Sequence, residues 1–152
     1  KLGRPLQAEH DAYWLLDRKE GNEKAFCCFH TTARDAARFG HLMLNGGNWH
    51  GRQLVPPDYM REAITPASYL RNQWDNGPLD YYGFQFWIVD IDGKNYPYMR
   101  GMYGQYIVVI PEREAIFVRM GHKSTDVYVG PHQEDLFRYF ALATKILDAR
   151  EG

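Results

Sequence analysis

The sequence lacks a long hydrophobic run and an excess of charge of either sign. It contains only two serines and two cysteines. Its 152 residues carry a formal net charge of −1, which predicts no basic surface for nucleic acid or anionic membranes. No apolar run approaches the roughly 18 residues that a membrane span needs, and no signal peptide opens the sequence. We therefore expect a globular domain without a membrane span and without a nucleic-acid partner.

The two cysteines, Cys27 and Cys28, are adjacent in the sequence. Neighbouring cysteines rarely pair, because a disulfide normally needs Cα atoms at least about 4.4 Å apart. Two thiols are also too few for a zinc site, and the six histidines follow no metal-ligand spacing. We therefore expect two small, buried, unpaired cysteine side chains, and neither a metal ion nor a cofactor.

The two serines, Ser68 and Ser124, are not followed three positions later by lysine. A serine hydroxyl needs an adjacent base to become a nucleophile. A triad of Ser124 with His122 and Asp126 can be drawn, but no nucleophile elbow surrounds that serine. The sequence therefore predicts no serine nucleophile of its own.

The first half of the chain is expected to be mainly helical. Thr32 is a good N-cap with Asp35 three residues on, and apolar residues at helical spacing continue to a stop at 45–47. A short turn-and-strand unit over 48–55 and a second short helix over 56–63 follow. Residues 66–80 show little periodicity and are expected to form a loop.

The second half is expected to be an antiparallel meander closed by a helix. The predicted strands cover residues 82–90, 96–100, 105–110 and 115–120, separated by short turns. An apolar stripe predicts a helix over 131–149 that lies across the sheet. The predicted fold is α+β, an antiparallel sheet flanked by helices, in one domain over 1–152 with a mainly helical part (1–80) and a sheet part (81–152).

The most informative segment is a glycine-rich turn that leads into an apolar strand, residues 99–111, MRGMYGQYIVVIP. Gly101 and Gly104 permit backbone conformations and close approaches that a Cβ would forbid. A strand that begins beside such glycines can present a bare N–H to a substrate carbonyl, as an oxyanion hole requires. The alternative is a tight hairpin with glycines at its turn.

Three segments in this order, TTARDAARFG (31–40), YGFQFW (82–87) and the glycine turn, resemble the C-terminal half of the serine β-lactamase-like hydrolases. This family includes class C β-lactamases, penicillin-binding-protein relatives, esterases and 6-aminohexanoate-dimer hydrolases. The resemblance runs from about Pro5 to the last helix. It implies the C-terminal portion of the β-lactamase/transpeptidase-like fold, an activity on small amide or ester substrates, and two glycines where this chain has its cysteines.

The resemblance also implies the site residues. It places the family's third motif at Met99–Gly101, and the second oxyanion donor at the backbone N–H of Met102, with Gly101 keeping the approach open. Met99 stands where relatives carry lysine or histidine, so that charge is missing. The expected substrate-binding residues are Met99, Arg100, Tyr103, Gln105 and Trp74. Arg100 could instead be a surface charge, Tyr103 and Gln105 could instead hold the turn, and Trp74 lies in the loop that would border the cleft.

The family's Ser-x-x-Lys and Tyr-x-Asn or Tyr-x-Ser motifs precede this region in relatives and are absent from the sequence. The favoured hypothesis is a segment of a serine hydrolase whose nucleophile lies on a missing N-terminal portion or on another chain that completes the sheet. Such a segment is expected to be inactive alone and to have an exposed apolar sheet edge and a half-built cleft at Gly101. The alternatives are a non-catalytic binding or interaction module with a closed polar surface there, and an autonomous histidine-based hydrolase. The resemblance is compatible with a bacterial periplasmic or secreted location.

Overall fold

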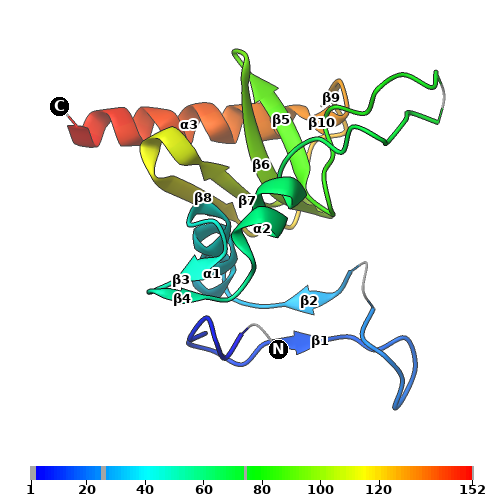
Figure 1. Cartoon of the computed structure of the whole chain (residues 1–152), viewed down its shortest axis with the longest axis vertical. Coiled ribbons are helices and arrows are strands. Elements are labelled where there is room, and N and C mark those ends of the chain that lie inside the picture. Colours follow the sequence, from blue (N-terminus) through cyan, green and yellow to red (C-terminus); the bar gives the residue numbers. More distant parts are fainter. Residues whose placement is uncertain (1–2, 25–26, 74, 152) are drawn as a thin grey trace.

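The computed structural model describes residues 3–24, 27–73 and 75–151, arranged as helices on both sides of an antiparallel sheet (Figure 1). The elements before the sheet are β1 (Tyr13–Trp14), β2 (Phe29–His30), α1 (Ala33–Leu44), β3 (Asn48–Trp49), β4 (Arg52–Gln53) and α2 (Pro57–Ala63). The remaining elements are β5 (Trp87–Ile91), β6 (Lys94–Gly101), β7 (Gln105–Ile110), the 3₁₀ turn η1 (Pro111–Arg113), β8 (Ala115–Arg119), β9 (Tyr128–Val129), β10 (His132–Gln133) and α3 (Glu134–Glu151). In the part of the chain described, no helix is both long and apolar enough to cross a membrane.

The central sheet has the strand order β5-β6-β7-β8, with every neighbouring pair antiparallel. The predicted meander is therefore confirmed. Helix α3 lies across one face of this sheet, and α1 packs on β7 and β8 from the other face (Figure 1). The prediction that the closing helix covers the sheet is confirmed as well.

Each face of the sheet carries its own hydrophobic core, because successive side chains of a strand point to opposite faces. On the α3 face the buried residues are Val89, Tyr96, Tyr98, Tyr106, Val108, Ile110, Leu136 and Phe140. On the α1 face they are Leu6, Leu42, Met43, Trp49, Met60 and Val109. The second core joins the sheet to α1, α2 and the N-terminal turn, so the elements before and after residue 80 share buried surface.

Helix α1 approaches the sheet closely at Gly40. A Cβ added there would lie 2.9 Å from Ile107 Cγ2 and 3.2 Å from Ile116 Cγ2. Real side chains do not tolerate such short contacts without movement of the neighbour. A glycine in the middle of a helix is otherwise unfavourable, so its role here is to allow close helix–sheet contact.

The predicted cap of α1 is confirmed, and Asp35 has further partners. The Asp35 N–H donates to Thr32 Oγ1 (3.2 Å), and the Asp35 carboxylate accepts from Arg38 Nε (3.1 Å). The same buried carboxylate accepts from the backbone N–H groups of Glu9 (2.8 Å) and His10 (3.2 Å). The hydrogen bonds to this carboxylate from the Glu9 N–H above all, and from Thr32 and His10, lower the pKa of Asp35 to about 2. Asp35 therefore joins the helix to the N-terminal segment.

Two predicted boundaries differ from the structure by three residues or more. The first long strand begins at Trp87 rather than Tyr82. Residues 82–86 instead contact the C-terminal end of α2, where the Phe84 N–H donates to Ala63 O (2.9 Å). Gln85 has a φ of 64°, which is outside the strand region. The last helix begins at Glu134 rather than at residue 131, because His132 and Gln133 pair with β9.

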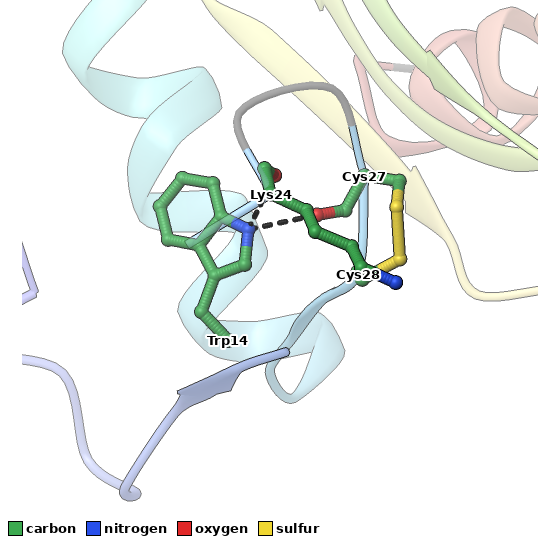
Figure 2. The surroundings of a disulfide bond; sticks show 4 residues. All are labelled: Trp14, Lys24, Cys27 and Cys28. Atoms are coloured by element: carbon green, nitrogen blue, oxygen red, sulfur yellow. Dashed lines mark hydrogen bonds between the residues drawn. A yellow bond between two sulfur atoms is a disulfide. The ribbon is translucent and has the colours of Figure 1, made fainter. Parts of the chain in front are cut away.

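The prediction of two unpaired, buried cysteines is wrong. Cys27 and Cys28 form a disulfide with their Cα atoms 3.8 Å apart, and both residues are only partly buried (Figure 2). In an extended chain the two side chains would point to opposite sides. Cys28 instead has a φ of 72°, and this left-handed conformation allows the two sulfur atoms to meet.

Candidate functional site

The glycine turn connects the two central strands of the sheet. Gly101, the last residue of β6, pairs with Gln105, the first residue of β7, and three residues lie between them. Tyr103 and Gly104 have φ values of 60° and 76°, so the chain reverses through two left-handed residues. Met102 and Tyr103 are 75% and 58% exposed, which leaves an apolar surface at the turn.

Gln105 fixes the turn through its side-chain amide. Its Nε2 donates to Met102 O (3.0 Å) and to Gly121 O, and its Oε1 accepts from the Gly121 N–H (3.0 Å). All of these partners are backbone groups of the turn and of Gly121. Of the two roles considered for Gln105, its contacts in the structure are those of a residue that holds the turn.

Arg119, which the sequence analysis did not single out, holds the other side of the turn. Its guanidinium donates to the carbonyl oxygens of Tyr103 (3.1 Å), Gly104 (2.6 Å) and Lys123 (2.8 Å). A Cβ on Gly104 or Gly121 would lie 2.0 Å from Arg119 Nη1. Gly121 lies two residues after Arg119 in the sequence, but Gly104 is 15 residues before it and comes close to the arginine only in the fold.

Within residues 3–24, 27–73 and 75–151, the backbone N–H of Met102 has no hydrogen-bond acceptor. It lies beside Gly101, which has no side chain to cover it, while Gln105 and Arg119 bind the carbonyl oxygens of Met102 and Tyr103. A rigid backbone donor that is free of protein partners can stabilise negative charge on a carbonyl oxygen.

Met99 and Arg100 lie on opposite faces of the sheet. Met99 packs against the core on the α1 face, which is also the face of Gly101 by the alternation of β6. Arg100 lies on the α3 face, where its guanidinium stacks over Trp87 (4.7 Å from the ring centroid) and donates to Pro131 O (3.0 Å). The structure therefore does not bring these two predicted substrate-binding side chains together. The predicted residue Trp74 lies outside the described residues.

The sequence analysis also missed a buried polar cluster near Arg100. The hydroxyl of Tyr98 lies 2.7 Å from His132 Nδ1, and both side chains are buried. Burial, with a further contribution from the nearby Arg100 charge, lowers the pKa of His132 to about 4, so this histidine is neutral at pH 7. Burial also raises the pKa of the Tyr98 hydroxyl. A neutral, hydrogen-bonded His132 serves as a core residue in β10, directly before α3.

Ser124 and the metal-ligating residue types give no second site in the described part of the chain. Ser124 Oγ accepts from Gln133 Nε2 (2.9 Å), a contact with the residue that precedes α3. Among the residues that the structure describes, no three His, Cys, Asp or Glu side chains gather in an arrangement that could hold a metal ion. The glycine turn therefore remains the candidate site.

Comparison with known proteins gives matches at the level of structure only. No protein-family model and no curated protein sequence matches the chain. A protein from Bacillus anthracis, assigned as a 6-aminohexanoate-dimer hydrolase, matches 96% of this chain with a TM-score of 0.70 and 23% identity. A protein from Bacteroides dorei, assigned as a β-lactamase, matches 97% of the chain with a TM-score of 0.60 and 17% identity.

A penicillin-binding protein homologue from Caulobacter crescentus matches 72% of the chain with a TM-score of 0.54 and 22% identity. The chain spans 36%, 49% and 31% of the lengths of these three structures. At these identities the likeness is one of fold. The chain therefore has the fold of the β-lactamase-like and transpeptidase-like proteins, over about a third to a half of their length.

Proposed function

We propose that this chain forms the third-motif strand and the oxyanion-hole wall of a β-lactamase-like serine hydrolase that acts on amide or ester bonds. The observation that carries the proposal is the free Met102 N–H at a turn held rigid by Gln105 and Arg119. An oxyanion donor must be in position before the reaction begins, because its value comes from preorganisation.

The surface at the turn also supports this function over that of a non-catalytic binding module. A closed polar surface is expected for such a module, whereas Met102 and Tyr103 leave the turn apolar and exposed. The only serines, Ser68 and Ser124, are not followed by lysine at the third position. The nucleophile is therefore assigned to a Ser-x-x-Lys motif outside this sequence, on a preceding segment or on another chain that completes the sheet.

The test compares the 152-residue chain with a longer protein that includes the residues encoded before Lys1. Each is incubated with a fluorescent β-lactam or a fluorophosphonate and analysed by intact mass and peptide mapping. We expect an adduct only on the longer protein, at a serine outside the present sequence. A stoichiometric adduct on Ser68 or Ser124 would overturn the proposal, as would a longer protein without any reactive serine.

A variant of the longer protein tests the wall itself. A Cβ on Gly101 would lie 3.0 Å from Gln105 Cβ, so Gly101→Val both covers the Met102 N–H and pushes on the residue that holds the turn. Loss of one oxyanion donor lowers kcat by about 10²–10³-fold. Gly3→Val is the matched control, because a Cβ at Gly3 meets only Ala8, at 4.0 Å. Near-normal turnover by Gly101→Val would show that the wall lies elsewhere.

A further inference from the structure

The backbone of the segment that carries the Cys27–Cys28 disulfide accepts hydrogen bonds from β1 and the residue after it. The indole N–H of Trp14 donates to Cys27 O (2.7 Å) and to Lys24 O (2.9 Å), as Figure 2 shows. One residue further along, the Leu15 N–H donates to Cys28 O (3.0 Å). The carbonyl oxygens of both cysteines therefore hold β1 against the segment that carries the disulfide.

The disulfide joins the residue whose backbone conformation makes these contacts. Cys28 has a φ of 72°, in the left-handed region that non-glycine residues rarely occupy. The covalent bond to Cys27 keeps the two side chains on one side and so retains this conformation. When the bond is broken, the Cys28 backbone can relax to a negative φ, and its carbonyl turns away from the Leu15 N–H.

The contacts continue from this strand to helix α1. The Trp14 ring packs edge-on against Phe29 of β2, with the ring centroids 5.2 Å apart. Phe29 in turn packs against Phe39 of α1, with centroids 6.0 Å apart. Loss of the carbonyl contacts would free Trp14 and loosen the β1–β2 hairpin, whereas α1 keeps its own contacts with the sheet.

We propose that Cys27–Cys28 is a reversible modification site for dithiols, and that only its oxidised form holds the β1–β2 hairpin in place. Both cysteines are partly exposed residues, and thiol–disulfide exchange requires that the attacking thiol reach one of their sulfur atoms. A thiolate of the dithiol attacks one cysteine sulfur and forms a mixed disulfide, while the other cysteine leaves as a thiolate. The second thiol of the reagent then releases the first cysteine, which leaves two protein thiols and an oxidised dithiol.

The test uses the full 152-residue chain with dithiothreitol as the probe. Before reduction, N-ethylmaleimide should add to neither cysteine, and after reduction it should add to both, as read by intact mass. Hydrogen exchange of the Leu15 amide should become about tenfold faster on reduction, since a left-handed non-glycine residue is disfavoured by about that factor. Removal of dithiothreitol and addition of an oxidised dithiol should restore the slow exchange.

The control is the double variant Cys27→Ser/Cys28→Ser, in which the Leu15 amide should exchange rapidly with or without reductant. Amides in the middle of α1 report whether the rest of the chain stays folded, and their exchange should not change. Alkylation of both cysteines without reductant would overturn the proposal, and so would unchanged exchange at Leu15 after reduction. An equal rise of exchange in α1 would also contradict it, because the disulfide would then support the whole fold.

Discussion

The close contact of α1 with the sheet gives a quantitative test of the fold. In Gly40→Ala the new methyl group would lie 2.9 Å from Ile107 Cγ2 and 3.2 Å from Ile116 Cγ2. Both neighbouring atoms are on short, branched side chains of the sheet, so the contact is relieved only if the helix or the strands move. Overpacking of this kind costs about 1–3 kcal/mol.

The same substitution has an opposing effect within the helix. Alanine in a helix interior is favoured over glycine by about 1 kcal/mol. The two effects together predict that Gly40→Ala lowers the free energy of unfolding by about 1 kcal/mol. Urea unfolding followed by circular dichroism measures this change directly.

A double-mutant cycle with Ile107→Ala separates the two effects. Without the Ile107 Cγ2 atom the shortest contact disappears, so Gly40→Ala in that background should be neutral or stabilising by up to about 1 kcal/mol. An increase in stability on Gly40→Ala in the wild-type background would refute the close contact. An equal loss in both backgrounds would refute Ile107 as its partner.

Three further predictions concern the turn and two buried groups. Gly121→Ala should displace the Arg119 guanidinium, whose Nη1 would lie 2.0 Å from the new Cβ, and amide exchange at the turn should rise as in Arg119→Ala. The pKa of Asp35 is about 2 against an ordinary 3.8, so its contribution to stability is complete above pH 3.8 and is lost as the pH falls toward 2. The urea midpoint of Asp35→Asn should not show this loss at low pH. The pKa of His132 is about 4 against 6.5, so its contribution is complete above pH 6.5 and is lost as the pH falls toward 4; in His132→Gln the midpoint should not fall over this range.

Local sequence signals predicted the helices and strands better than they predicted contacts between residues far apart in the sequence. The cap of α1 follows from Thr32 and Asp35 three residues apart, and the structure confirms it. The hydrogen bonds from Glu9 and His10 to the same carboxylate join residues about 25 positions apart, and no local pattern reports them. The carboxylate was therefore predicted as a helix cap and is in fact also a tertiary contact.

The same distinction explains the errors near the sheet and the site. Tyr82–Phe86 has the composition of a strand, but its Phe84 N–H is taken by Ala63 at the end of α2. The glycine turn was located from Gly101 and Gly104, while Arg119 could not be assigned to it because that contact spans 15 residues. The cysteine prediction failed because it rested on the usual Cα separation of a disulfide, whereas Cys27 and Cys28 pair with their Cα atoms 3.8 Å apart and with Cys28 in a left-handed conformation.

The most direct test of the proposed oxyanion wall removes the Met102 N–H alone. In the longer protein with its own nucleophile, Met102 is replaced by the corresponding α-hydroxy acid, which puts an ester oxygen in place of the backbone N–H and keeps the side chain. The same replacement at Tyr103 serves as the matched control, because it is the next residue of the turn. The account predicts that the acylation rate falls by about 10²–10³-fold for the Met102 ester and by far less for the Tyr103 ester. A near-normal rate with the Met102 ester, or a loss confined to the Tyr103 ester, would contradict it.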